Sequence, residues 1–156
     1  MIETRLERAL RTRFERDRDI EARLFQLSGP LGSFGAKIDL AYVTGLITLM
    51  AHRDLTTFKD IRNLFAHNLQ IKDFRSRRIA DKARNLRLID DHVVDAKPDG
   101  GAERPSAVFG RGIPALYVKH ATTRKKKARD RYLMTAQLFT LRFATADLKT
   151  WPLPLI

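Results

Sequence analysis

The stretch that decides the fold reads SGPLGSFGAKIDLAYVTGLITLMA and covers residues 28–51. Its first eight residues hold three glycines and a proline, which predicts a tight connection, because glycine adopts unusual backbone angles and proline cannot continue a helix. Residues 36–50 are apolar on nearly every side, so we expect a helix that is the most buried part of the molecule, with Gly45 permitting close helix approach. The apolar run 38–51 has about 14 residues, short of the roughly 20 of a membrane span.

Four further helices are predicted around this segment, because apolar residues recur at spacings of three and four. They cover residues 2–27, 53–69, 74–88 and 123–148. Residues 90–119 are rich in glycine and proline, with Val93, Val94 and residues 107–109 as short extended candidates, which predicts an irregular loop or a small hairpin. The expected fold class is all-α: a compact bundle of about five helices that forms one domain over residues 1–156. The apolar tail, residues 150–156, is expected to dock on a groove or on a second protomer.

Composition and charge indicate the class of partner. The 156 residues include 30 Lys and Arg against 18 Asp and Glu, a net charge of +12 that favours a polyanion such as nucleic acid. The absence of cysteine excludes disulfides, thiolate nucleophiles and cysteine-containing metal sites. The N-terminus is dense in charge where a signal peptide needs an apolar run, so we expect a cytoplasmic protein with no membrane partner.

The positive charge is concentrated in two clusters. Residues 72–87 hold seven basic residues against two aspartates, and residues 119–131 hold seven against one. Such runs are often solvated helix faces, but two of them on one small domain favour polyanion binding. The residues expected to bind nucleic acid are Lys72, Arg75, Arg77, Arg78, Arg84, Arg124, Lys125, Lys126, Lys127 and Arg129.

One helical segment, DIRNLFAHNL at residues 60–69, contains a candidate chemical site. Asn63 and His67 are one turn apart on one face, and Arg62 reaches that face through its long side chain. A guanidinium, an amide and an imidazole so grouped would bind an RNA phosphate, with His67 moving the proton of a 2′-hydroxyl. In the alternative structural interpretation, Arg62 pairs with a buried Asp39 while Asn63 and His67 bind backbone carbonyls.

The remaining sequence gives no support for a cofactor or a metal. The glycines of SGPLGSFGAK lack the spacing of a phosphate-binding loop. The four histidines lie on different predicted elements and form no close pair. We therefore expect no cofactor and no metal site.

Two segments, LSGPLGSFGAKIDLAYVTGLI (residues 27–47) and DLTTFKDIRNLFAHNL (residues 54–69), closely resemble the mannitol repressor family. Its members carry a GPLGSF-type turn, an IDLAY helix and an IRN-x-FAH helix in this order. IADKARNLRL (residues 79–88) and RYLMTAQLFTL (residues 131–141) are similar to later helices of the family, so the family-like core spans residues 24–148. The resemblance implies a compact all-helical fold and a transcriptional repressor or corepressor of sugar-alcohol operons.

The IRNLFAH segment also resembles the R-x-x-x-x-H motif of HEPN domains, helical bundles that include metal-independent endoribonucleases acting at a dimer cleft. This resemblance implies that Arg62 and His67 form a catalytic pair and that Asn63 is the polar residue after the arginine. Three hypotheses follow: a repressor-like regulator, a HEPN-type endoribonuclease, and a non-catalytic adaptor bundle. The expected partners are a second copy of the chain and either nucleic acid or a DNA-binding protein. The DNA-binding protein is included because the sequence shows no convincing helix-turn-helix motif.

Overall fold

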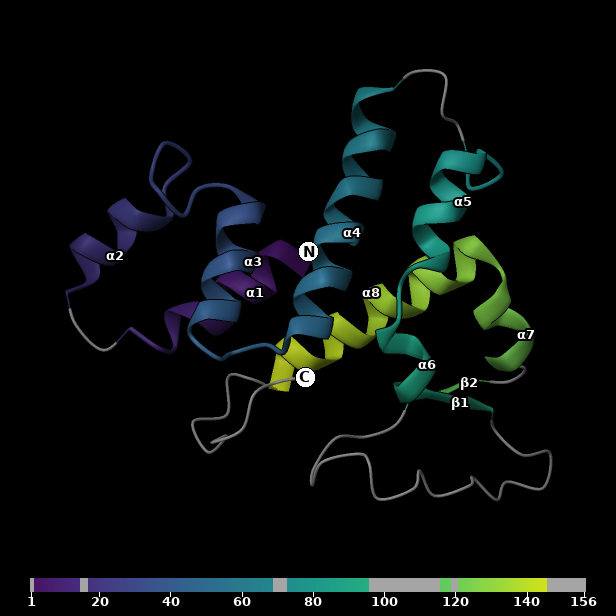
Figure 1. The fold of residues 1–156 in the computed structure, drawn as a ribbon. Helices are drawn as coiled ribbons and strands as arrows, with labels where there is room; N and C mark the ends of the chain where they lie inside the picture. Colours follow the sequence, from purple (N-terminus) through teal and green to yellow (C-terminus); the bar gives the residue numbers. More distant parts are fainter. Residues whose placement is uncertain (1, 15–16, 69–72, 96–115, 119–120, 146–156) are drawn as a thin grey trace. The chain divides into compact units, whose positions relative to one another are not determined.

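The fold was obtained as a computed structural model that describes residues 2–14, 17–68, 73–95, 116–118 and 121–145 (Figure 1). These residues form helices and one pair of three-residue strands, which confirms the all-α class. In chain order the elements are α1 (Ile2–Arg11), α2 (Arg18–Phe25), α3 (Phe34–Val43), α4 (Leu49–His67), α5 (Arg77–Arg84), α6 (Leu88–His92), β1 (Val93–Asp95), β2 (Leu116–Val118), α7 (Ala121–Lys126) and α8 (Ala128–Thr145). Lys72, residues 107–109 and the tail at 150–156 lie outside the described residues.

The chain divides into two compact units. Unit 1 comprises residues 1–60 and 139–156, and unit 2 comprises residues 61–138. Helices α4 and α8 each contribute residues to both units. No helix of the described ranges is both long enough and apolar enough to span a bilayer.

Several of the predicted helices are interrupted, including the predicted helix 74–88, which ends as α5 at Arg84 before α6 begins at Leu88. The predicted helix 2–27 is α1 followed by α2, because Asp17 adopts a positive φ of 42° and its carboxylate accepts hydrogen bonds from the N–H groups of Asp19 and Ile20. This capping starts a new helix although the apolar periodicity continues through the break. The predicted helix 123–148 is likewise divided into α7 and α8 at Lys127.

Unit 1 is held together by a buried charged group between α1 and α3. The Lys37 ammonium, 5% exposed, lies 2.8 Å from a carboxylate oxygen of Glu7 and 3.2 Å from one of Glu3. Burial lowers the pKa of Lys37, but the hydrogen bonds that its ammonium donates to the two glutamates more than offset this effect, so the pKa is raised overall. Glu7 also pairs with Arg11, which binds Glu21 of α2 at 2.6 Å. This chain of ion pairs links the first three helices.

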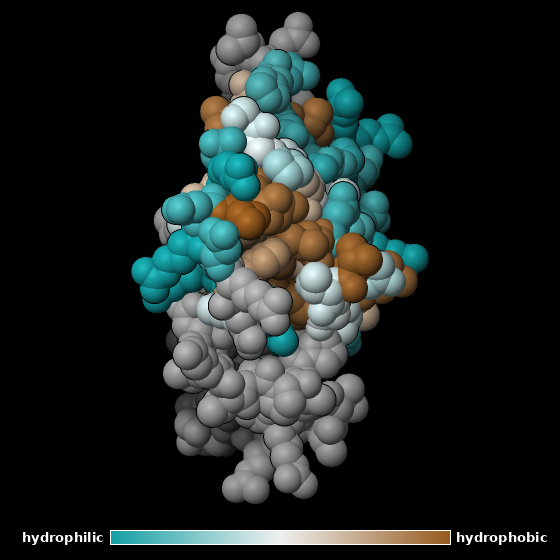
Figure 2. All heavy atoms as spheres, turned by 90° about the vertical axis from the view of Figure 1, so that its left-hand side faces the viewer, coloured by the Kyte–Doolittle hydropathy of each residue, from teal (hydrophilic) through white to brown (hydrophobic). Residues whose placement is uncertain are grey.

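The segment 36–50 is not the most buried part of the molecule, contrary to the sequence prediction. Its helix α3 ends at Val43, and only one of its faces is buried. Val43 is 78% exposed, and further large apolar residues of unit 1 are also exposed: Ile20, Leu27, Tyr42, Leu49 and Met50. Figure 2 shows hydrophobic side chains gathered on the face of the molecule where α2 and α3 lie in Figure 1. The apolar residues of this segment therefore lie partly at the surface and partly in the core.

Gly45 ends α3 through its backbone conformation. It adopts φ 69°, and the Gly45 and Leu46 N–H groups donate to the carbonyls of Tyr42 and Ala41 at 3.0 and 2.8 Å. This is the hydrogen-bond pattern of a Schellman C-cap. A Cβ at Gly45 would meet no atom within 4 Å, so the predicted role in close helix approach is wrong. Crowding occurs instead at Gly29, where a Cβ would lie 2.3 Å from the Arg23 carbonyl oxygen.

Unit 2 has its own apolar core. Ile61 of α4 packs with Ile79 and Ala83 of α5, and the predicted inward positions Leu86 and Leu88 are also fully buried. Three aromatic rings border this core: Phe74 lies 5.0 Å from Phe65 and 5.3 Å from Tyr132, between ring centroids. The predicted inward face of the segment 74–88 is confirmed.

The two described strands do not form a hairpin with each other, and the predicted extended residues 107–109 lie outside the described residues. β1 and β2 pair in parallel, with Val93 opposite Leu116 and Asp95 opposite Val118. A hairpin requires antiparallel strands, whereas a parallel pair needs a crossover connection. The extended character of Val93 and Val94 is confirmed.

Replacing Gly45 by Ala should lower the free energy of unfolding by about 1 kcal/mol, because an L side chain is strained at this left-handed φ. Gly35→Ala, within helix α3, is the matched control. The new Cβ would make only ordinary contact, 3.4 Å from the ammonium nitrogen of the flexible Lys59 side chain. This control should be neutral or stabilising by up to about 1 kcal/mol. Urea unfolding of both variants checks the prediction, and an equal response at the two positions would contradict it.

Candidate functional site

The positive charge of the chain lies almost entirely in unit 2. Residues 61–138 contain 18 Lys and Arg and 8 Asp and Glu, a net charge of +10 out of the total of +12. Unit 1 carries the remaining +2. An anionic partner is therefore attracted mainly to unit 2.

The predicted binding residues of the described ranges are largely at the surface of this unit. Lys125 is half-buried, and the others are exposed: Arg75, Arg77, Arg78, Arg84, Arg124, Lys126, Lys127 and Arg129. Some of the charge in the first cluster is neutralised locally, because Asp81 lies 2.6 Å from Arg84 and 3.7 Å from Arg77. The second cluster retains more of its charge.

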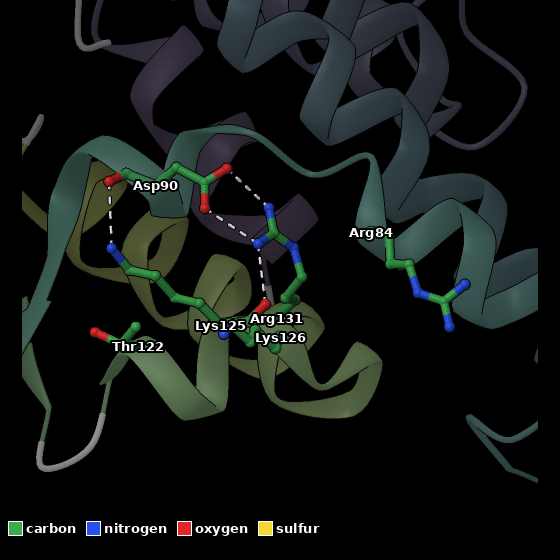
Figure 3. Close-up of a pocket in the computed structure, with 6 residues that line it drawn as sticks. All are labelled: Arg84, Asp90, Thr122, Lys125, Lys126 and Arg131. Atoms are coloured by element: carbon green, nitrogen blue, oxygen red, sulfur yellow. Dashed lines mark hydrogen bonds and ion pairs between the residues drawn. The ribbon is translucent and has the colours of Figure 1, made fainter.

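The two basic clusters meet at a hollow of about 430 Å³ (Figure 3). Arg84 of α5 comes from the first cluster, whereas Lys125 and Lys126 of α7 and Arg131 of α8 come from the second. Asp90 of α6 and Thr122 of α7 complete the lining. Among the described residues, four cations and one carboxylate line the hollow. This balance of charge favours an anionic occupant.

Arg131 is the structural centre of this site. Its side chain is only 10% exposed, and its two terminal nitrogens lie 3.1 and 3.0 Å from the two carboxylate oxygens of Asp90. The same guanidinium donates to the Lys125 carbonyl at 2.9 Å and to the Leu86 carbonyl. The Arg131 side chain therefore links α8 to Asp90 of α6, to Leu86 before α6 and to Lys125 of α7. It also neutralises the Asp90 carboxylate.

The two lysines keep their charge uncompensated. The Lys125 ammonium donates to the Asp90 backbone carbonyl at 3.2 Å, which is a neutral acceptor. Within the described ranges, neither Lys125 nor Lys126 forms an ion pair with a carboxylate. In Figure 3 the Arg84 guanidinium is directed away from Arg131, at the edge of the hollow. Positive charge available to a ligand is thus concentrated on α7.

The prediction that Asp39 and Arg62 are buried is wrong, because both side chains are exposed. The Asp39 side chain is 71% exposed, and one of its oxygens lies 2.8 Å from His52 Nε2. Arg62 is exposed on α4, and its positive charge acts on Tyr132, whose pKa is raised by burial and lowered in part by this arginine. The carboxylate is tolerated in its apolar segment because it lies on the solvent side of α3.

The candidate catalytic residues are accessible. Arg62, Asn63 and His67 are all exposed on α4, with His67 as its last residue. They do not line the hollow described above. Within the described part of the chain, no group of three or more His, Asp or Glu side chains is arranged to hold a metal ion.

Three residues of the hollow were not predicted from the sequence. Asp90, Thr122 and Arg131 were absent from the expected binding set, whereas Arg84, Lys125 and Lys126 were present. Arg131 lies within the second basic cluster, so the signal of charge density did include it. Its burial depends on acceptors 41 and 45 residues away, which local sequence patterns do not reveal.

Replacing Arg131 by Met should destabilise the fold by about 2–4 kcal/mol, because the Asp90 carboxylate and two carbonyls lose their donor. Arg129→Met, on the exposed side of the same helix, is the matched control and should change stability by less than about 0.5 kcal/mol. Thermal and urea unfolding monitored by circular dichroism measure both effects. Similar stabilities of the two variants would show that the Arg131 contacts do not stabilise the fold.

The family of the chain follows from comparison with known proteins. The model of one family, described as mannitol repressor, matches residues 18–135. No curated protein and no solved structure matches the chain. The matched range includes α2 to α7, all six residues that line the hollow and the GPLGSF and IRNLFAH segments. The chain therefore belongs to the mannitol repressor family.

Proposed function

We propose that the protein is a cytoplasmic regulator of the repressor or corepressor type that binds nucleic acid through the basic surface of unit 2. The observation that carries this proposal is the concentration of +10 of the net +12 charge in residues 61–138. Repression, which the family name implies, requires contact with DNA or with a protein bound to it. The exposed arginines and lysines of α5, α7 and α8 supply such a surface.

The proposed mode of binding is contact with the phosphate backbone. Lysine and arginine side chains neutralise phosphates and release counterions, and these contacts carry no base information. The longest basic run, residues 124–127, lies on α7 and the residue after it. This helix is too short to act as a recognition helix of the usual kind. We therefore propose sequence-tolerant binding, with any operator specificity supplied by a DNA-binding partner protein.

Binding to duplex DNA and RNA should weaken steeply with salt, and Lys125, Lys126 and Lys127 should account for part of the slope. Replacing all three by Gln should reduce the slope of log K against log salt by up to about three, since each neutralised phosphate of a duplex contributes about 0.9. Fluorescence anisotropy over a series of salt concentrations measures the slope.

The matched control removes the same charge from unit 1. Arg13, Arg18 and Arg23 are exposed there, and their joint replacement by Gln should leave the slope nearly unchanged. Equal reductions in the two triple variants would mean that only total charge matters. Undetectable binding at low salt would overturn the proposed function.

A second candidate function is metal-independent RNA cleavage by a homodimer. The observation that favours it is the joint exposure of Arg62, Asn63 and His67, since the structural interpretation required Asp39 to pair with Arg62. Across a two-fold axis, two such helices would place two guanidiniums and two imidazoles around one phosphodiester. The exposed apolar residues of unit 1, such as Val43 and Met50, support self-association, because burial between two copies would remove them from water.

His67→Ala should abolish RNA cleavage in the presence of a chelator, if this second function holds, and should leave folding and RNA binding nearly intact. DNA should be spared because it lacks the 2′-hydroxyl nucleophile. His52→Ala is the control, because His52 is bound to Asp39 outside this group. Sedimentation of the wild-type chain gives its mass in the same buffer. A monomeric chain that does not cleave RNA would exclude the nuclease function and leave the regulator as the proposed function.

A further inference from the structure

The hollow between the two basic clusters has properties that a surface for nucleic-acid backbone does not need. Its volume of about 430 Å³ is in the range of pockets for small molecules. It is assembled from four helices, α5 to α8, rather than from one exposed run. Its polar wall is held in place by the contacts of Arg131 with Asp90 and with the carbonyls of Leu86 and Lys125. These contacts hold Arg131, Asp90 and the backbone of Lys125 together before any ligand arrives.

The charge of the hollow defines the class of ligand. Asp90 is neutralised by Arg131, and Arg84 is paired with Asp81, which leaves two uncompensated positive charges on Lys125 and Lys126. A phosphate monoester carries a charge of about −1.5 to −2 at neutral pH and presents three acceptor oxygens. A carboxylate carries one negative charge and would balance only one of the two positive charges.

We infer that this hollow binds a small phosphate monoester, and that the bound ester competes with nucleic acid for Lys125 and Lys126. The competition rests on the proposed function, because the same lysines belong to the proposed nucleic-acid surface. The phosphate oxygens would accept hydrogen bonds from both ammonium groups, so the nucleic acid would lose these contacts. The ester would thereby act as an inducer, releasing the regulator from its nucleic acid.

The test uses the full chain and three probes that share a three-carbon skeleton: glycerol phosphate, glycerate and glycerol. Calorimetric titration at low salt should show saturable binding of glycerol phosphate, weaker binding of glycerate and none of glycerol. In the double variant Lys125→Gln with Lys126→Gln, the dissociation constant for glycerol phosphate should rise by about tenfold or more, because two charge-assisted hydrogen bonds are lost.

The matched control is the double variant Arg75→Gln with Arg77→Gln. It removes the same net charge from unit 2, but the two side chains, 95% and 96% exposed, do not line the hollow. It should bind glycerol phosphate within about twofold of the wild type, because the effect of a distant exposed charge is screened by salt. Circular dichroism verifies that both double variants are folded. A similar rise of the dissociation constant in the two double variants would mean that only net charge determines the affinity. That result would overturn the inference.

Competition gives a second readout. Saturating glycerol phosphate should weaken the binding of duplex DNA or RNA to the wild-type chain and should have little effect on the Lys125 and Lys126 double variant. Ester binding with no change in nucleic-acid affinity would overturn the regulatory role. If no ester binds while nucleic acid still binds in a salt-dependent manner, the inference fails and the proposed function stands.

Discussion

The guanidinium of Arg131 makes the contacts on which the proposed binding site of unit 2 depends. It is buried, and it donates to the Asp90 carboxylate and to the carbonyls of Leu86 and Lys125. Without these acceptors a buried cation would be costly, and without the cation three acceptors would lose their donor. The interaction also sets the electrostatics of the hollow, because it cancels the one carboxylate in its lining. The same contacts of Arg131 thus stabilise unit 2 and keep the potential of the hollow positive.

The two units differ in net charge, and the proposed binding is assigned to unit 2. Unit 1 is nearly neutral, with Lys37 balanced by Glu3 and Glu7. Unit 2 carries an excess of charge that its own ion pairs do not neutralise, and self-repulsion of this kind disfavours a compact state. The proposed binding of nucleic acid supplies a reason to keep this charge, since contacts with phosphates need it. The matched range ends at residue 135 and so includes most of unit 2.

Local periodicity predicted most helices and the inward positions of the segment 74–88, because those properties depend on neighbours three and four residues apart. The break between α1 and α2 was missed, since it depends on the capping of one helix by Asp17 rather than on the apolar pattern. The burial of residues 36–50 was overestimated, because composition does not tell which face of α3 another element covers. In the site, charge density pointed to Arg84, Lys125 and Lys126. The roles of Asp90 and Arg131 depend on contacts across 41 residues, which no local pattern encodes.

The central claim is that unit 2, and not unit 1, forms the nucleic-acid interface. The most direct measurement is an NMR titration of the isotope-labelled chain with a short DNA duplex at low salt, followed through the backbone amide shifts. The account predicts perturbations on α5, α7 and the first turns of α8, with the amides of α1 to α3 unchanged. Perturbations centred on α1 to α3, or spread evenly over both units, would contradict it.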